Sequence, residues 1–161
     1  MPTIKIRPAT IDDSALILRF ITELAIYEKA EHEVVANESH IRESLFGDSV
    51  KAHGFICEID NKAVGYAVYF VNYSTWLGKY GIYLEDLYVS PEHRGSGAGK
   101  AMLRKLAQIA VEKGCTRVEW SVLDWNQPAI DFYLALGAKP QDEWTVYRLT
   151  GQALKDFAQK N

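Results

Sequence analysis

Hydrophobic and polar positions along the chain switch between alternation and helical spacing several times. Residues 3–7 (TIKIR) alternate and predict a short first strand. Residues 10–28 begin with Thr10 three positions before Asp13, which is the spacing of a capping box, and continue with apolar residues at helical spacing. A second helix is expected over 37–47, closed by a glycine.

The middle of the chain carries β-rich runs. Residues 54–70 contain two such runs around Asp60-Asn61-Lys62, which is a hairpin signal. Residues 81–90 (GIYLEDLYVS) predict another strand, on which simple alternation places Glu85, Leu87 and Val89 on one face and Leu84, Asp86 and Tyr88 on the other. A helix follows and runs to about Lys113.

The last third of the chain predicts two more strands and two more helical segments. Residues 117–123 and 143–150 predict two strands. Between them, residues 126–137 predict a short helix with Asn126 as its N-cap and a glycine beyond its end. Residues 150–161 have the pattern of a surface helix or tail.

Taken together, the elements run β-α-α-β-β-β-α-β-α-β, which predicts the α/β class with hairpin neighbours and a strand–helix–strand crossover. The chain has 161 residues, of which 48% are hydrophobic and 24% charged, and this composition is typical of a globular protein. We expect a single domain over residues 1–161 with a central mixed sheet flanked by helices.

Charge, the length of apolar runs and cysteine spacing exclude several classes of partner and site. The formal net charge is −3, so a nucleic-acid partner is not expected. No apolar run approaches the roughly 20 residues of a membrane span, and the first ten residues lack an apolar signal core, so we expect a cytoplasmic protein without a membrane partner. Cys57 and Cys115 have no metal-ligand spacing, so no metal is expected and both thiols are interpreted as reduced.

Three glycines crowd into five positions directly before the third helix, as Gly95, Gly97 and Gly99. The spacing fits neither a Walker A loop nor a dinucleotide-binding GxGxxG motif. Bare backbone at the first turn of a helix still offers unpaired N–H groups and the positive end of the helix dipole, which suit a pyrophosphate. The alternative is a glycine-rich turn with no ligand.

The pattern Arg94-x-x-Gly97-x-Gly99, after a strand and before a helix, resembles the acetyl-CoA motif of the GCN5-related N-acetyltransferases (GNAT). The segments IRPAT, ELAIYE, W-x-G-K, YLEDLYV, RGSGAG, WN-x-P-x-I-x-FY and LGA narrow the resemblance to the spermidine/spermine N1-acetyltransferase and thialysine N-acetyltransferase group. The resemblance covers nearly the whole chain. It implies the GNAT-type acyl-CoA N-acyltransferase fold with a mostly antiparallel sheet, acetyl-CoA as co-substrate, and a homodimer.

The resemblance also implies which residues contact acetyl-CoA. They lie at the end of the 81–90 strand, in the glycine-rich turn, and around the 126–137 helix. The expected set is Leu87, Tyr88, Val89, Arg94, Gly95, Ser96, Gly97, Ala98, Gly99, Lys100, Asn126 and Tyr133.

Acetyl transfer to an amine needs a base, an oxyanion donor and an acid. Tyr133 is the expected acid, because the resemblance places it beside the coenzyme sulfur; alternatively it is a core tyrosine, since apolar residues share its helical face. Glu85 is the expected base, acting through a water molecule, with a solvated strand end as the alternative. The backbone N–H at or near Val89 is the expected oxyanion donor if the strand splays there.

A small cationic amine would need carboxylates between aromatic walls. The expected substrate-binding residues are Tyr27, Glu28, Trp76, Glu85, Asp86 and Trp144. Alternatively, the acid-rich stretch between Glu23 and Glu43 is a solvated face, and the tryptophans are packing residues. Ser74 and Thr75 stand where polyamine enzymes of the group often carry an acid and a proline, which puts spermine in doubt.

The leading hypothesis is therefore an acetyl-CoA-dependent N-acetyltransferase that acts on a diamine, a polyamine or a thialysine-like amino acid by direct attack through a tetrahedral intermediate. One alternative is acetylation of a protein N-terminus or lysine. Another is a non-catalytic acetyl-CoA-binding sensor.

Overall fold

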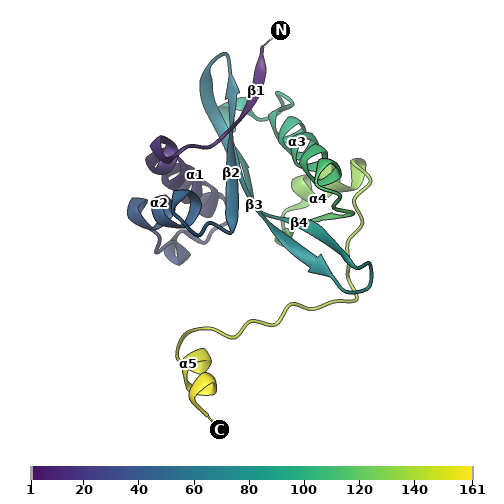
Figure 1. The fold of residues 1–161 in the computed structure, drawn as a ribbon. Coiled ribbons are helices and arrows are strands. Elements are labelled where there is room, and N and C mark those ends of the chain that lie inside the picture. The colour runs from purple at the N-terminus through teal and green to yellow at the C-terminus, as the bar shows by residue number, and fades with distance from the viewer. Residues whose placement is uncertain (1, 161) are drawn as a thin grey trace. The chain divides into compact units, whose positions relative to one another are not determined.

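The computed structural model describes residues 2–160 as two compact units, one ending at Ser121 and one beginning at Val122. The first unit is built on a five-stranded sheet in the order β1-β2-β3-β4-β5 (Figure 1). Four strands are antiparallel to their neighbours, and β5 runs parallel to β4. The strands are β1 (Ile4–Pro8), β2 (Ala52–Ile59), β3 (Lys62–Ser74), β4 (Lys79–Val89) and β5 (Val118–Glu119). This mixed sheet with flanking helices confirms the expected fold class.

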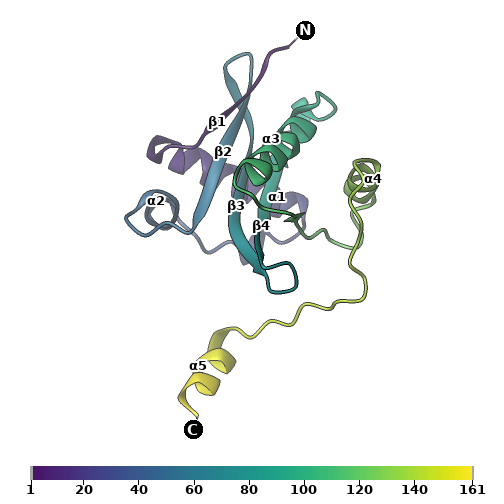
Figure 2. The same cartoon turned by 45° about the vertical axis from the view of Figure 1, so that its right-hand side comes forward.

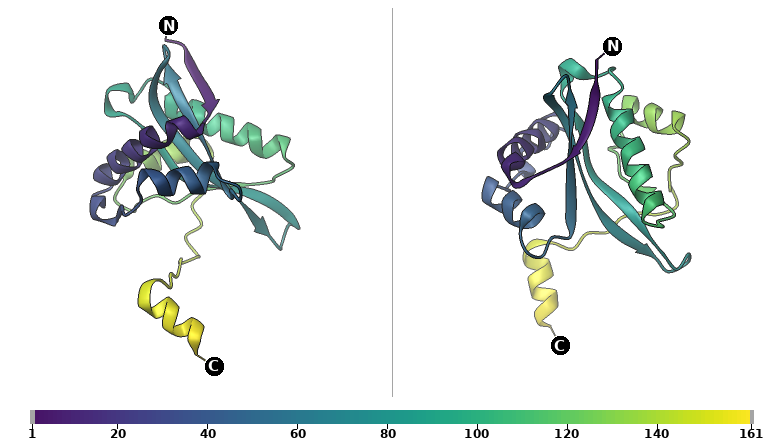
Figure 3. Two further views of the ribbon diagram at one scale, coloured as in Figure 1. Left: turned by 60° about the vertical axis from the view of Figure 1, so that its left-hand side comes forward. Right: turned by 45° about the horizontal axis from the view of Figure 1, so that its top comes forward.

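Helices cover both faces of the sheet. Helices α1 (Ser14–Tyr27) and α2 (Glu38–Phe46) lie on one face, and α3 (Ala98–Glu112) lies on the other, as Figures 1 and 2 show. The right-hand view of Figure 3 shows the same sandwich of helices around the sheet. Short 3₁₀ turns, η1 (Ile11–Asp13), η2 (Glu31–Glu33) and η3 (Pro91–His93), join these elements.

Each face buries its own apolar cluster. Under α1 and α2, a cluster of apolar and aromatic side chains is buried: Ile17, Phe20, Ile41, Ile56, Tyr66 and Tyr88. On the opposite face, α3 buries a stripe at helical spacing: Met102, Leu103, Leu106 and Ala110. The first turn of α3, which carries the glycines, is therefore held against the sheet.

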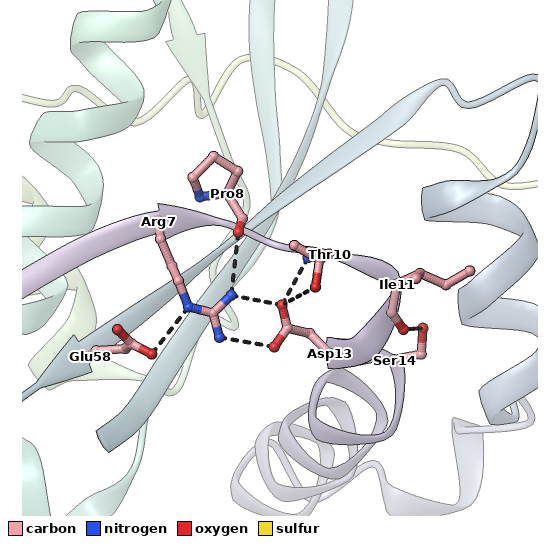
Figure 4. Close-up of polar contacts among 7 residues, drawn as sticks. All are labelled: Arg7, Pro8, Thr10, Ile11, Asp13, Ser14 and Glu58. Atoms are coloured by element: carbon pink, nitrogen blue, oxygen red, sulfur yellow. Dashed lines mark hydrogen bonds and ion pairs between the residues drawn. The ribbon is translucent and has the colours of Figure 1, made fainter. Parts of the chain in front are cut away.

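The IRPAT segment forms a polar clamp between the first elements of the chain (Figure 4). The Arg7 guanidinium on β1 donates two hydrogen bonds to Asp13, at 2.8 and 2.9 Å, and its Nε donates to Glu58 on β2 at 3.1 Å. Asp13 also accepts the Thr10 N–H at 2.8 Å, as the capping-box spacing predicted. The guanidinium bonds hold the pKa of the Asp13 carboxyl below its usual range.

The β2–β3 hairpin turns at the predicted place. Ile59 pairs with Lys62, so the loop has two residues, Asp60 and Asn61. Both have positive φ angles, +50° and +66°, which is the conformation of a type I′ turn. Asn and Asp tolerate this conformation better than other side-chain-bearing residues, which is why this pair predicted the turn.

The second unit contains α4 (Gln127–Ala135) and α5 (Gly151–Gln159). The predicted helix around 126–137 is confirmed, and Gly137, whose φ is +93°, lies just beyond its end. Asn126 occupies the N-cap position, as predicted, but its side chain makes no capping hydrogen bond to α4. The expected C-terminal helix is confirmed as α5.

Two strand predictions are corrected. The strand expected over 117–123 is reduced to the two residues of β5, because pairing with β4 stops after Tyr83 and Glu119. The strand expected over 143–150 is absent from the described part of the chain. Alternation gives that stretch the preference for an extended conformation, but a strand also needs a neighbour to complete its hydrogen bonds.

Both thiols are free, and Cys57 is completely buried. Burial raises the pKa of the Cys57 thiol to about 11. Among residues 2–160, no cluster of three or more potential metal ligands occurs, and no helix is long and apolar enough to cross a membrane.

Candidate active site

Strand β4 contains one extra residue relative to β3. Leu84 pairs with Tyr69 and Asp86 pairs with Val68, so Glu85 is the extra residue at a shift in the register. This is a β-bulge, a device that locally bends a strand and redirects side chains. Glu85 is exposed there, whereas its neighbour Leu84 is buried.

The bulge corrects the assignment of faces along β4. Tyr69 and Val68 are consecutive on β3 and point to opposite faces, so their partners Leu84 and Asp86 also lie on opposite faces. Simple alternation placed those two on one face. Asp86 instead shares the α1-covered face with Tyr88, while Leu84 lies on the α3 side.

A partly buried acidic cluster forms on the α1-covered face. The Tyr66 hydroxyl donates a 2.5 Å hydrogen bond to Oδ2 of Asp86. Burial raises the pKa of Asp86, and the hydrogen bond from Tyr66 partly offsets this. Glu28, the C-cap residue of α1, has a raised pKa because it is partly buried and close enough to feel the charge of Asp86. The structure thus brings together two of the expected substrate carboxylates.

The outer edge of β4 is open beyond its contact with β5. Within residues 2–160 only Ile82 and Tyr83 pair with β5, so from Leu84 onward that edge meets no strand. The Ser90 N–H donates to the Val64 carbonyl on β3 at 2.8 Å. Because successive backbone groups of a strand point to opposite sides, the N–H of Val89 faces the open edge.

The glycine-rich turn follows at the end of this edge. Gly95 and Gly97 have φ angles of +78° and +92°, in the left-handed region, and Gly97 is the N-cap of α3. A Cβ added at Gly97 would come no closer than 3.8 Å to Ile4, and one at Gly95 would meet nothing within 4 Å. Backbone conformation rather than crowding therefore requires glycine here, and the space above the backbone is open to a ligand.

Arg94 connects the turn to two other elements. Its Nε donates to the Val89 carbonyl at 3.2 Å. Its guanidinium lies 4.8 Å from the centre of the Tyr27 ring and 6.0 Å from that of Tyr88, which is cation–π distance. Tyr88 in turn donates to Glu23 at 2.7 Å. Arg94, which is expected to bind the coenzyme, thus lies directly beside Tyr27, which is expected to bind the amine.

The remaining expected residues lie elsewhere. Trp76 is in the β3–β4 turn and is 85% exposed. Asp86 lies seven positions along β4 from Lys79, at the base of that turn, which is roughly 20 Å along a strand. Trp76 is therefore not part of the acidic cluster within this unit. Asn126, Tyr133 and Trp144 all belong to the second unit, with Tyr133 on α4.

Sequence reasoning missed Tyr66. It sits inside an apolar run, where a tyrosine is indistinguishable from an ordinary core residue. Tyr66 is a diagonal neighbour of Asp86, because Tyr66 pairs with Tyr88 and Val68 pairs with Asp86. This neighbour follows only from the register. The hairpin turn at Asp60-Asn61 fixes the β2–β3 register but not that of β3 against β4.

Comparison with known proteins bears on this geometry. A family model described as "Acetyltransferase (GNAT) family" matches residues 21–138. A thialysine N-epsilon-acetyltransferase of Bos taurus is 41% identical over 171 residues, covering 99% of this chain and all of the relative. An L-ornithine N5-acetyltransferase of Arabidopsis thaliana is 31% identical, covering 98% of this chain and 89% of the relative.

Among solved structures, an integron cassette protein from the mobile metagenome of V. cholerae has a similar fold. The TM-score is 0.81 at 24% identity, and the match covers 98% of each chain. At that identity the similarity concerns the fold alone.

Proposed function

This chain belongs to the acetyltransferase (GNAT) family and is an N-acetyltransferase of amines, and we propose that it moves an acetyl group from acetyl-CoA to a primary amine of a small basic amino acid. The observation that carries the proposal is the junction of the open β4 edge with the glycine-rich turn. There an outward-facing backbone N–H, a helix N-terminus and an arginine meet within a few residues.

The glycine-rich turn fits the pyrophosphate of the coenzyme. The first-turn N–H groups of α3 that have no acceptor within the helix suit an anion, and the helix dipole has the matching sign. Gly95 and Gly97 leave the space over this backbone open, and Arg94 adds a cation. The pantetheine arm would follow the unpaired edge of β4, where Leu87, Tyr88 and Val89 lie, and Ser96, Ala98, Gly99 and Lys100 complete the expected contacts. Asn126 and Tyr133 remain proposed coenzyme contacts, as the resemblance to the family implies.

The transfer chemistry is assigned to three groups. Acetyl-CoA supplies an activated thioester carbonyl. We assign the oxyanion of the tetrahedral intermediate to the Val89 N–H, which faces the open edge. Glu85, exposed at the bulge, accepts the proton of the attacking amine through water, and Tyr133 protonates the departing thiolate.

A basic amino acid suits the acidic cluster better than a long polyamine does. Glu28 and Asp86 offer two closely spaced carboxylates, enough for one ammonium group that does not react. Thialysine and ornithine each carry a second ammonium group at a fixed distance from the amine to be acetylated. Full-length similarity to acetyltransferases named for these two substrates supports the same choice. Ser74, in place of an acid, fits a short substrate. Tyr27 would be one wall, beside Arg94.

We propose that both units serve one acetyltransferase domain. The family match over 21–138 crosses the boundary between Ser121 and Val122, and the relatives align with nearly the whole chain. Trp144 keeps its proposed place in the amine site, and Trp76 is proposed to contact the amine site of a second copy. The homodimer and the cytoplasmic location stay predictions.

The test is release of coenzyme A thiol from acetyl-CoA with thialysine, ornithine, lysine, spermidine, spermine, a short diamine and a lysine-containing peptide. We expect thialysine or ornithine to be turned over with kcat/KM at least tenfold above the peptide and spermine. Turnover of the peptide above the small amines would favour protein acetylation. No turnover, with tight acetyl-CoA binding by calorimetry, would favour the sensor.

A further inference from the structure

We propose that Tyr66 is a positioning residue that holds the Asp86 carboxylate to receive the non-reacting ammonium group of the substrate. This inference rests on the proposed function and extends it to a residue on β3. The Tyr66 hydroxyl, in the core, is hydrogen-bonded to Asp86 of the acidic cluster.

Packing fixes the Tyr66 ring. The side chain is 0% exposed, and its ring stacks on Phe20 of α1 at 5.7 Å between centres and lies 6.4 Å from Tyr88 of β4. A ring held on both sides directs its hydroxyl to one place. That hydroxyl donates to Oδ2 of Asp86 at 2.5 Å, so one carboxylate oxygen is held and the other keeps its capacity to accept a bond.

The charges that face Asp86 are mostly negative. Glu28 approaches from the end of α1, and Glu85 is the preceding residue of β4. Tyr66 faces Asp86 from β3. On the same face, Tyr88 is bonded to Glu23, which is paired with Arg19, and Arg94 lies over Tyr88. Two carboxylates close together and partly removed from water create a strong preference for a cation between them.

Burial favours the protonated form of Asp86. The Tyr66 hydrogen bond acts in the opposite direction, because it stabilises the carboxylate, and it lowers the pKa of Asp86. Without the hydroxyl the pKa would rise further, and less Asp86 would be ionised at a given pH. An ammonium group would then bind more weakly, and most of all at the acidic end of the working range.

The test is Tyr66→Phe, which keeps the ring and removes only the hydroxyl. Thialysine and butylamine are compared as substrates between pH 6.5 and 9. At pH 7 we expect a roughly tenfold rise in KM for thialysine, the size of a lost hydrogen bond to a charged group, with kcat within threefold of the wild type. The difference in the KM for thialysine between Tyr66→Phe and the wild type should shrink as pH rises. Butylamine, which lacks a second ammonium group, should show no such change.

Tyr69→Phe is the matched control. Tyr69 is also a buried tyrosine of β3, but its ring neighbours are His53 and Phe55 on the other face of the sheet. This variant should keep the wild-type KM at every pH. An equal rise in KM in Tyr69→Phe would overturn the inference, since it would trace the effect to loss of any buried hydroxyl.

If the wild type turns over thialysine and Tyr66→Phe has an unchanged KM, the role of Tyr66 is overturned but the proposed function is not. A wild type with no turnover would overturn the proposed function as well. If Tyr66→Phe does not fold, Asp86→Asn is compared with Tyr66→Phe/Asp86→Asn. Equal KM values are expected because Tyr66 acts through the carboxylate, and a further rise in the double variant would overturn the inference.

Discussion

At the scale of single residues, some glycines of the glycine-rich turn are required by backbone conformation and others by the approach of a ligand. Gly97 needs its left-handed angle, whereas Gly99 has an ordinary backbone conformation, and an added Cβ there would lie 3.9 Å from Val89. The sequence identified the three glycines as a group. It could not tell which were required by the fold, because φ angles do not follow from spacing.

Gly97→Ala is expected to lower the free energy of unfolding by about 1 kcal/mol, because alanine resists the left-handed conformation. Gly99→Ala should leave it unchanged or raise it, because Gly99 lies within the first turn of α3. Urea unfolding measures both. Acetyl-CoA binding, followed by calorimetry, should weaken in both variants, because each methyl group narrows the approach to the backbone. An equal loss of stability in the two variants would contradict this assignment.

Tyr133→Phe is expected to lower kcat by roughly 100-fold, the usual range for loss of a general acid, while the Kd of acetyl-CoA changes less than threefold. Tyr73→Phe, an exposed tyrosine of β3, is the control and should behave as the wild type. Steady-state kinetics and calorimetry give the two quantities. An unchanged kcat would remove Tyr133 from the mechanism and leave it as a packing residue.

At the scale of elements, the sequence predicted the first four strands, the hairpin and all the long helices. Those elements are specified locally, by periodicity, caps and turn residues such as Asp60-Asn61. The bulge in β4 was not predicted, because alternation before and after it looks continuous. Its trace in the sequence is two consecutive acids, Glu85 and Asp86, in an apolar strand. The short β5 and the missing 143–150 strand depend on pairing partners, which alternation does not specify.

The clamp between β1, η1 and β2 gives an element-scale prediction. Asp13→Asn should lower the free energy of unfolding at pH 7 by roughly 1–3 kcal/mol, because the charged hydrogen bonds to Arg7 are weakened. Asp12→Asn, an exposed neighbour, is the control and should change little.

The pH dependence of this difference has a defined sign. The pKa of Asp13 is lowered in the folded state, so its stabilisation is complete above the unfolded value of about 3.9 and is lost as pH falls below it. The gap between wild type and Asp13→Asn should therefore close below about pH 4. Thermal unfolding across pH 2.5–7 measures it, and a gap that stays constant would contradict the clamp's electrostatic origin.

At the scale of the whole molecule, the chain separates into a sheet unit and a C-terminal unit. The proposed base and oxyanion donor lie in the first, and the proposed acid lies in the second. Composition and length predicted one domain. They carry no information on how strongly the last forty residues are tied to the rest, because that depends on contacts between segments far apart in the sequence.

Limited digestion with chymotrypsin tests this division. Residues 138–150 contain Trp144 and Tyr147 and, between α4 and α5, form neither helix nor strand. We expect mass spectrometry to find the first cuts there, before any cut at the buried aromatic residues of the sheet. Resistance of this stretch, in a sample that sediments as a dimer, would contradict the expectation and indicate that a second copy supplies the missing strand partner.

The bulge at Glu85 adds one residue to β4 that the neighbouring pairs do not need. If that residue were deleted, Leu84 and Asp86 would keep their present partners, Tyr69 and Val68, and β4 would become an unbroken ladder with every buried side chain still inside. The pairing of β4 with β3 does not require the extra residue. A protein one amino acid shorter should therefore be an equally good or better scaffold and a poor catalyst, which separates in a single deletion what the chain needs to fold from what it needs to react.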